Sequence, residues 1–482
     1  MLDSRRDIKP FFNRAYKISI KFIFTSFFIS LLFALVLAYV PEYTLSKDGV
    51  NTLFILVFAA GLWVSEAIPA FAVSLLVIAL EILLLGFSDF DFSDQSGWEI
   101  YLKQWSSPLI FLFLAGFIMA LAASKTKLDV WLAKRVLLLV GNRPQNIITG
   151  LMAVTYILSM FISNTATAAM MMTILAPMLY NIDSSNKFSK AIILSVAVSA
   201  NLGGMATIIG TPPNAIAVGI LAQNAPSFIG WMGLALVPSL IMVVMLRYML
   251  LKLYPSNQEH IDLQSITEVE HFDDSTKEFS GMPIIPSWKK SVTILIFVVT
   301  ILLWLSGPWH HIPTTAISFI PIIGFTLFGI IDADDICKIR WDVIILIIGG
   351  LSLGFAVSKS GLDMWLATLI STDGFSVLWI TLIFSYFVVV ISNFMSNTAA
   401  TNITLPIVVA IAATLSADSS SFAAIAVALS ASFAMSLPVS TPPNAIVYAT
   451  NKIHSKDFLI IGAVTALIGP LAVVGWLFMW YN

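Results

Sequence analysis

The chain has little charge, one cysteine and few histidines. Charged residues make up 11% of its 482 residues and hydrophobic residues 58%, whereas about 25% of a typical soluble domain is charged. This composition excludes an ordinary soluble globular protein. The 25 basic and 27 acidic residues nearly balance, so no basic surface for nucleic acid is expected. The single cysteine, Cys337, excludes a disulfide framework and a cysteine-rich metal site.

Sequence signatures of enzymes are missing as well. There is no His-Glu-x-x-His motif for a zinc protease and no Gly-x-x-x-x-Gly-Lys-Ser/Thr loop for a P-loop ATPase. Instead, many apolar runs such as 22–40 are long enough for a helix to cross a hydrocarbon core of about 30 Å. That run shows no alternation of polar and apolar residues, which argues against a transmembrane barrel. We therefore predict a polytopic, all-α membrane protein and no enzyme.

The apolar runs predict eleven transmembrane helices. They lie near 20–41, 51–66, 68–87, 107–124, 189–222, 229–252, 291–308, 313–331, 342–358, 420–450 and 457–480. Two further apolar regions, about 145–180 and 375–414, are each too long for one span and contain a polar triplet near the middle. We expect each of them to form a re-entrant helical hairpin.

Basic residues predict the orientation, because Lys and Arg collect in cytoplasmic loops. With the N-terminus in the cytoplasm, all basic residues except Lys47, Lys103 and Lys359 fall on the cytoplasmic side. The basic segment before the first apolar run, without a small-x-small cleavage site, predicts an uncleaved first span. We expect a multi-pass protein of the plasma membrane, the inner membrane of a bacterium, with its C-terminus outside. The acidic stretch 254–288 is then a cytoplasmic linker between two halves.

Three segments occur twice in the same order. Residues 114–133 align with 348–367, LSMFISNT at 158–165 with ISNFMSNT at 391–398, and GTPPNAI at 210–216 with STPPNAI at 440–446. The chain therefore consists of two related halves. Because five predicted crossings separate their starts, the halves are expected to be inverted relative to each other, which is the architecture of alternating-access secondary transporters.

Each half carries a Ser-Asn-Thr triplet at the tip of its predicted hairpin and a Thr-Pro-Pro-Asn stretch inside a later span. Adjacent prolines interrupt a helix, because proline lacks the N–H and its ring clashes with the preceding turn. Unwound backbone at membrane depth is tolerated where it is buried in protein or lines a cavity. The repeated breaks therefore predict a binding site, although small polar residues can also simply hydrogen-bond between membrane helices.

The chemical groups at these motifs are neutral oxygens and amides. Freed carbonyls near Gly210 and Ser440, with nearby hydroxyls and amide oxygens, suit a small hard cation such as sodium. Ser159 and Ser392 lie one helical turn before the triplets and can join the same clusters. Half-helix N-termini, Thr165, Thr398 and the Asn amides suit an anionic oxygen.

No Lys, Arg or His lies in a tip or a break. A dianion would therefore need co-bound cations to offset its desolvation, which favours cation-coupled symport over exchange. Glu66 and Glu81 are the carboxylates inside apolar runs, so a proton-coupling role has to be considered. We expect Glu66 to cap a helix N-terminus at a cytoplasmic turn, and we assign no role to Glu81.

The paired Ser-Asn-Thr triplets, the paired Thr-Pro-Pro-Asn breaks and the Trp-x-Ser-Glu-Ala-Ile-Pro stretch at 63–69 resemble the divalent anion/sodium symporter (DASS) family over nearly the whole chain. The resemblance implies a homodimeric elevator-type secondary transporter with a scaffold and a moving transport domain. It divides the chain into an N-terminus and first span (1–50), scaffold (51–141 and 289–370), transport domain (142–253 and 371–482) and linker (254–288).

The resemblance also implies the site residues. The first sodium site would comprise Ser159, Ser163, Asn164 and Gly210, and the second Ser392, Met395 through its backbone, Asn397 and Ser440. The substrate carboxylates would face Asn164, Thr165, Thr211, Pro212, Asn397, Thr398, Thr441 and Pro442. No organic cofactor is implied.

The intact triplets resemble those of sodium-coupled carboxylate carriers, so the expected function is sodium-driven uptake of a C4 dicarboxylate such as succinate, malate or fumarate. A citrate or sulfate carrier and a dicarboxylate exchanger on the same fold are the alternatives. A passive anion channel is a different class, disfavoured because two closed hairpins suggest alternating occlusion. The sequence decides neither the dicarboxylate nor the number of sodium ions per cycle.

Overall fold

The structure is a computed structural model that describes residues 20–40, 44–87, 97–181, 187–261, 286–369 and 376–481. Over these residues the secondary structure is entirely helical. Eight helices are long and apolar enough to cross a membrane, and six shorter apolar helices accompany them. The prediction of an all-α, multi-pass membrane fold is confirmed. Much of the predicted linker 254–288 and the predicted N-terminus before residue 20 lie outside the described residues.

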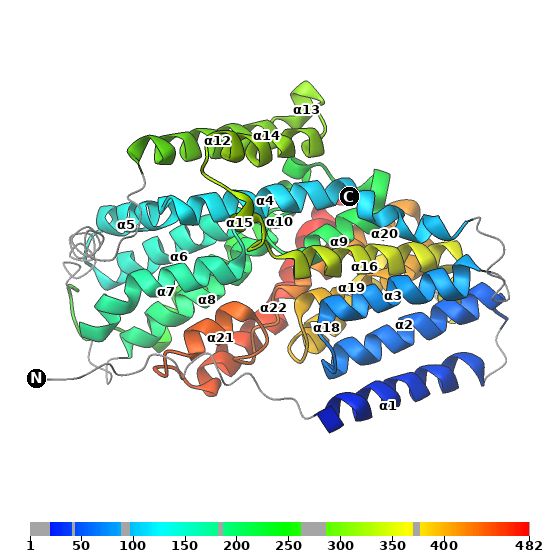
Figure 1. Ribbon diagram of the computed structural model, residues 1–482. Helices are drawn as coiled ribbons and strands as arrows, with labels where there is room; N and C mark the ends of the chain where they lie inside the picture. The colour runs from blue at the N-terminus through cyan, green and yellow to red at the C-terminus, as the bar shows by residue number, and fades with distance from the viewer. Residues whose placement is uncertain are drawn as a thin grey trace, which may run out of the picture.

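Helix α1 (Ile20–Tyr39) precedes the repeat, and the two halves follow with the same succession of main helices (Figure 1). The first half comprises α2 (Lys47–Ser65), α3 (Ala70–Glu81), α4 (Pro108–Lys125), α5 (Leu128–Val140), α6 (Pro144–Phe161), α7 (Asn164–Asn181), α8 (Phe188–Met205), α9 (Pro212–Leu221) and α10 (Phe228–Leu253). The second comprises α12 (Ser287–Leu305), α14 (Thr314–Leu327), α16 (Trp341–Lys359), α17 (Leu362–Leu369), α18 (Val377–Ser392), α19 (Asn397–Ala413), α20 (Ala417–Ala431), α21 (Pro442–Tyr448) and α22 (Ser455–Tyr481).

Short elements complete the described chain. They are the π-helix η1 (Ile82–Gly86), the 3-10 helices η3 (Trp98–Ser106) and η4 (Ala222–Asn224), and the short helices α13 (Gly307–His310) and α15 (Ala333–Ile336). The helix pairs α6/α7 and α18/α19 occupy the two regions predicted to be hairpins.

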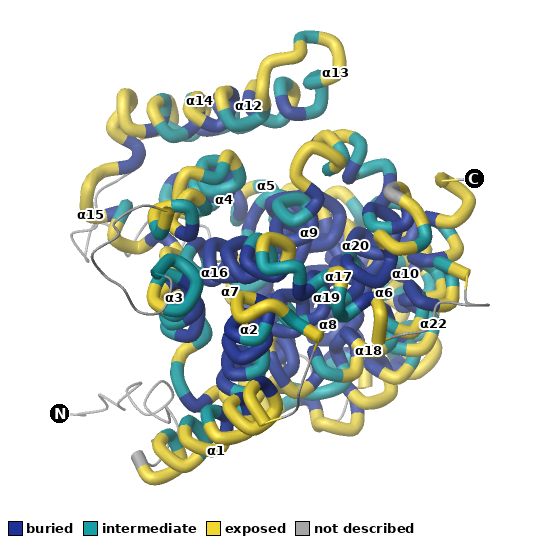
Figure 2. The backbone as a smooth tube through the Cα atoms, turned by 90° about the vertical axis from the view of Figure 1, so that its right-hand side faces the viewer, coloured by how far each residue is buried: buried dark blue, intermediate teal, exposed yellow. Residues whose placement is uncertain are grey.

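The halves interlock rather than stand side by side. Helix α9 of the first half packs on α19 and α20 of the second, and α21 of the second packs on α7 and α8 of the first. In the same way α3 packs on α16 and α4 on α14. Figure 2 shows the buried core along α8, α9, α19 and α20, with α1, α12 and α14 at the periphery. The helix that follows each break therefore packs against the other half.

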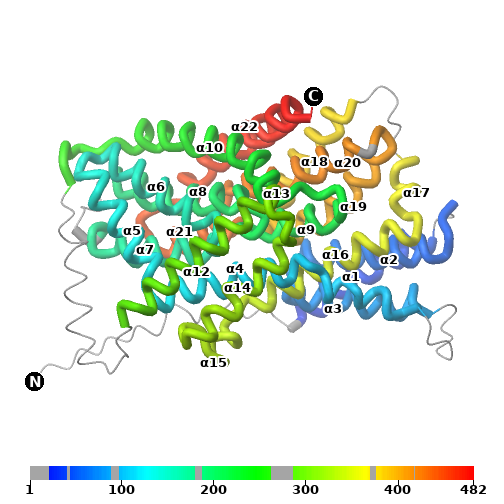
Figure 3. Tube along the Cα trace, turned by 90° about the horizontal axis from the view of Figure 1, so that it is seen from above, coloured from blue at the N-terminus to red at the C-terminus, as the bar shows by residue number. Residues whose placement is uncertain are grey.

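Helices α10 and α22, which end the two halves, lie together along one edge of the molecule, and α15 lies at the opposite edge (Figure 3). Both contain a proline, Pro238 and Pro470, within an otherwise continuous helix. The paired prolines of the breaks act differently. Pro212 and Pro442 occupy the first helical position of α9 and α21, where the missing N–H is not needed and the fixed φ suits the helix.

Two features of the turns between helices differ from what the sequence predicts. After α4 and α16 the chain turns into α5 and α17 through residues with positive φ, Lys127 (φ 54°) and Gly361 (φ 73°). These short amphipathic helices begin within the aligned repeat segments 114–133 and 348–367 but are too short to register as spans. The expectation for Glu66 was wrong: it ends α2 in the left-handed conformation (φ 49°), and Pro69 is the N-cap of α3.

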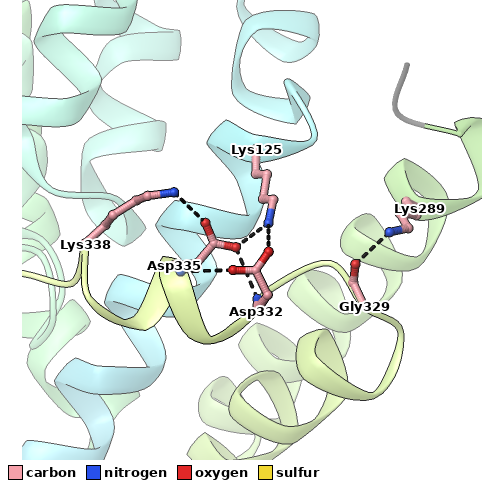
Figure 4. Close-up of polar contacts among 6 residues, drawn as sticks. All are labelled: Lys125, Lys289, Gly329, Asp332, Asp335 and Lys338. Atoms are coloured by element: carbon pink, nitrogen blue, oxygen red, sulfur yellow. Dashed lines mark hydrogen bonds and ion pairs between the residues drawn. The ribbon is translucent and has the colours of Figure 1, made fainter. Parts of the chain in front are cut away.

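A cluster of ion pairs joins the two halves outside the membrane-spanning helices (Figure 4). Lys125, at the end of α4, contacts Asp332 Oδ2 at 2.9 Å and also Asp335, both in the connection between α14 and α16. Lys338 Nζ lies 2.9 Å from Asp335 Oδ1, and Asp332 and Asp335 cap α15 reciprocally. The Asp335 side chain is only 3% exposed, so its charge depends on these partners.

Candidate transport site

The two hairpin tips have the same local construction. The helix α6 ends at Phe161 with Ile162 extended, and Ser163 Oγ then accepts a hydrogen bond from the Ala166 N–H at 3.2 Å. Ser396 is the N-cap of α19, accepting from the Ala399 N–H at 3.2 Å. Serine favours this position because its hydroxyl satisfies a free N–H of the first helical turn. Each triplet thus starts the second helix of its hairpin, with the helix N-terminus at the tip.

Oxygen atoms from three segments meet at Asn164. One terminal atom of its amide lies 2.7 Å from Ser159 Oγ, 3.2 Å from the Ala200 carbonyl oxygen and 3.3 Å from the Gly210 carbonyl oxygen. With nitrogen in this position, the two N–H hydrogens of the amide are shared among these three acceptors. With oxygen there, four oxygens converge, an arrangement that a hard cation can stabilise. The structure thus brings together Ser159, Asn164 and Gly210, as the sequence predicts.

Glycines make this convergence possible. A Cβ on Gly204 would lie 2.3 Å from the Asn164 amide, and one on Gly210 would lie 2.3 Å from the Gly204 carbonyl oxygen. A side chain at Gly203 would meet the Tyr156 carbonyl oxygen at 2.4 Å. The hairpin, helix α8 and the unwound segment therefore approach each other more closely than any side chain permits. The sequence analysis missed this role of the two adjacent glycines in α8.

The second half builds a related cluster with different partners. Ser392 lies one helical turn before the tip, and its Oγ donates to Asn397 Oδ1 at 2.6 Å. Met395 is buried, and Ser440 Oγ donates to the Leu437 carbonyl oxygen at 2.8 Å within the unwound segment. Asn393 joins the hairpin to that segment, because its Oδ1 accepts from the Ser436 N–H at 2.8 Å. The Ser392–Asn397 pair predicted from the sequence is thus present.

The asparagine of each Thr-Pro-Pro-Asn stretch hydrogen-bonds to the unwound backbone of its own break. Asn214 Nδ2 donates to the carbonyl oxygens of Met205 (3.3 Å) and Thr207 (2.7 Å). Asn444 Nδ2 donates to those of Met435 (3.2 Å) and Leu437 (3.0 Å). Unwound carbonyls without partners would be costly in the interior, so these two buried amides replace the missing helical hydrogen bonds. The sequence signal for this role is that the Thr-Pro-Pro-Asn stretch occurs once in each half.

The predicted substrate-facing residues lie at helix starts. Asn164 and Asn397 begin α7 and α19, and Thr165 and Thr398 follow them. Thr211 and Thr441 are the N-caps of α9 and α21, with Pro212 and Pro442 directly after them. Thr211, Thr398 and Thr441 are at most 8% exposed. These positions offer hydroxyls, amides and helix N-termini, which interact favourably with negative charge.

The two breaks differ in their surroundings. Ile209 is 7% exposed and touches Gly116 of α4, whereas Val439 of the second break is 80% exposed. Phe394 beside the second tip is 74% exposed. A cavity of about 380 Å³ lies elsewhere, between α9, α16, α17 and α19, and none of the predicted site residues, all within the described chain, lines it.

Two solved transporter structures share this fold. The YdaH transporter of Alcanivorax borkumensis aligns with a TM-score of 0.53 at 12% identity over 78% of this chain and 85% of its own. MtrF of Neisseria gonorrhoeae, described as belonging to a class of antimetabolite efflux pumps, aligns with a TM-score of 0.54 at 12% identity over 93% and 97%. Such identities establish the fold alone. The shared fold is an all-helical, multi-pass membrane fold.

The chain belongs to the family described as the sodium:sulfate symporter transmembrane region, whose family model matches residues 21–482. The resemblance to divalent anion/sodium symporters is thereby confirmed, and the protein is a transporter, not an enzyme. Sodium-dependent dicarboxylate transporters SdcS are similar: that of Staphylococcus saprophyticus is 30% identical over 92% of this chain and 88% of its own, and one from Staphylococcus aureus is 31% identical over the same shares. An uncharacterised transporter of Schizosaccharomyces pombe is 31% identical over 86% of the chain, which spans 47% of that protein.

Proposed function

We propose that the protein takes up C4 dicarboxylates such as succinate, malate and fumarate across the plasma membrane by symport with sodium. The observation that carries this proposal is the doubled oxygen cluster without a basic side chain. Ser159, Asn164 and Gly210 surround one position, and Ser392 pairs with Asn397 near the other. The names of the staphylococcal relatives support the same substrate class and ion.

The clusters account for coupling between ion and substrate. A dicarboxylate entering this site leaves water and meets no protein cation, at a cost of several kcal/mol even after relaxation. Sodium held by hydroxyl, amide and carbonyl oxygens next to the tips offsets that cost. Each tip asparagine can give its oxygen to the ion and its NH₂ to a carboxylate oxygen. Binding of the anion therefore requires the cation.

We also propose how the protein moves during transport and how it assembles. Alternating access would proceed by an elevator motion of the transport domain (142–253 and 371–482) against the scaffold (51–141 and 289–370), in a homodimer. The N-terminus would face the cytoplasm and the C-terminus the outside. The interlocked packing of α9 on α19 and of α21 on α7 supports a transport domain that moves as one unit.

Uptake of labelled succinate into proteoliposomes tests the function. We expect accumulation with an inward sodium gradient and none when potassium replaces sodium. Uptake that is indifferent to sodium would refute the coupling. Competition by malate, fumarate, citrate and sulfate at equal concentration separates the C4 proposal from the alternative carriers, and counterflow from loaded liposomes without sodium would reveal an exchanger.

The site assignment is tested separately. Asn164→Ala and Asn397→Ala each remove an oxygen for sodium and an NH₂ for the carboxylate, so we expect each to abolish uptake. Thermal unfolding in detergent should show that both variants remain folded. Normal transport by either variant would show that the residue does not belong to the site.

A further inference from the structure

A buried asparagine outside the predicted site connects its two halves. Asn201 lies on α8 of the first half and is 2% exposed. Its Nδ2 donates to Thr441 Oγ1 at 3.1 Å and to Asn444 Oδ1 at 3.2 Å, both in the break of the second half. These contacts join residues more than 200 positions apart. Neither the sequence motifs nor the proposed function gives Asn201 a role.

The same turn of α8 also touches the first half of the site. The carbonyl oxygen of Ala200, the preceding residue, accepts from Ser159 Oγ at 2.7 Å and lies 3.2 Å from the Asn164 amide. Gly204, one turn further on, contacts that amide directly. One helical turn therefore contacts the first oxygen cluster with its backbone and the second break with the side chain of Asn201.

The contact determines what Thr441 can offer a ligand. A threonine hydroxyl has one hydrogen to donate and two lone pairs to accept with. Thr441 Oγ1 accepts from Asn201 Nδ2 at 3.1 Å and from the Asn444 backbone N–H at 3.3 Å. With both lone pairs in use, the O–H remains as its free hydrogen-bonding group. Thr441 is thereby set as a donor, which suits a carboxylate oxygen.

The first half lacks this arrangement. Thr211, the counterpart of Thr441, makes no capping hydrogen bond to α9. At the shift of 230 residues that relates the two breaks, Asn201 corresponds to Ala431, so an apolar residue replaces the asparagine. Within the described chain, the buried Asn214 Oδ1 has no hydrogen-bond partner. The orientation of the hydroxyl is thus fixed in the second break only.

We propose that Asn201 is a positioning residue that saturates the lone pairs of Thr441 Oγ1, so that the Thr441 O–H is donated to a substrate carboxylate. The inference rests on the proposed dicarboxylate uptake. It makes the second break the more selective of the two for an anionic oxygen, because its hydroxyl cannot turn to accept a hydrogen bond from a neutral ligand group. Asn201 acts through Thr441 and touches no ligand itself.

The test measures sodium-driven succinate uptake in proteoliposomes with saturating sodium. Asn201→Ala frees a lone pair of Thr441, and we expect the KM for succinate to rise about 10- to 100-fold while kcat changes less than about threefold. Asn201→Asp has nearly the same volume but can only accept, so the Thr441 O–H would turn toward it and uptake should fall further. Asn402→Ala is the matched control: Asn402 is also buried, and its Nδ2 donates to the Leu346 carbonyl oxygen at 3.4 Å, so KM should stay within about twofold.

A double-mutant cycle separates a positioning role from a merely structural one. If Asn201 acts through Thr441, Thr441→Ala should raise KM similarly, and adding Asn201→Ala to it should change KM less than about twofold. Additive effects, or a KM for Asn201→Ala equal to that of the control, would overturn the inference. So would loss of folding in both Asn201 variants, because the residue would then act only in the core. Sodium-independent uptake by the unmodified protein would instead refute the proposed function.

Discussion

Replacing Gly204 by alanine should damage the first sodium site through a single contact. The added Cβ would lie 2.3 Å from one terminal atom of the Asn164 amide and 2.8 Å from its Cγ. Ordinary contacts between such atoms begin near 3.5 Å, so the amide has to move by about 1 Å. A displacement of that size in a binding site can cost about 100-fold in function.

The displacement disturbs the oxygen cluster. The Asn164 amide also lies 2.7 Å from Ser159 Oγ and 3.3 Å from the Gly210 carbonyl oxygen. Moving its amide away from Gly204 therefore changes the distances within the oxygen cluster itself. We expect the sodium concentration for half-maximal uptake to rise at least tenfold, with the succinate KM at saturating sodium affected much less.

The assay is sodium-dependent succinate uptake as a function of sodium concentration, with thermal unfolding measured on the same preparation. Gly475→Ala is the matched control, because nothing lies within 4 Å of a Cβ at that position of α22. Alanine there should leave uptake unchanged and leave stability equal or slightly higher. Equal sodium dependence of the two variants would refute the assignment of Asn164 to a sodium site.

Three further predictions concern stability and the second half of the site. Burial alone would raise the pKa of Asp335, but hydrogen bonds from Lys125 and Lys338 outweigh it and lower the pKa from 3.8 to about 2. The stability that the Asp335 ion pairs contribute is therefore complete above pH 4 and lost as the pH falls toward 2. Asp335→Asn should remove this acid dependence of the unfolding temperature. A plot of unfolding temperature against pH that runs parallel to that of wild type would refute the role of these ion pairs. Glu81→Gln keeps an oxygen for Ser352 and should retain uptake within twofold, so abolished uptake in a folded variant would assign Glu81 a functional carboxylate. Asn444→Ala removes the side-chain donor to the Met435 carbonyl oxygen and one of the donors to the Leu437 carbonyl oxygen, and it should lower uptake at least tenfold; wild-type kinetics would show that the break does not need this amide.

The sequence by itself determined the features that depend on local physics. Long apolar runs specify membrane helices, paired prolines end one helix and begin the next, and Ser-Asn-Thr starts a helix at each hairpin tip. The structure has α8 ending at Met205 and α9 beginning at Pro212, as the prolines require. The repeat was readable because matching segments leave a direct signal in the letters. The pair Ser159 and Asn164 could be predicted because both lie on one short stretch of chain.

Only the tertiary structure decided which distant residues complete the site. The Ala200 carbonyl and the contact of Gly204 with Asn164 arise because α8 packs against the first hairpin, and the bond from Asn201 to Thr441 arises because the two halves interlock. Nothing in the sequence near Asn201 marks it, because a buried asparagine in an apolar helix acquires its partner only when the other half packs against it. Local patterns fix helices and their breaks, whereas the hydrogen bonds that give each hydroxyl its direction depend on packing across the whole chain.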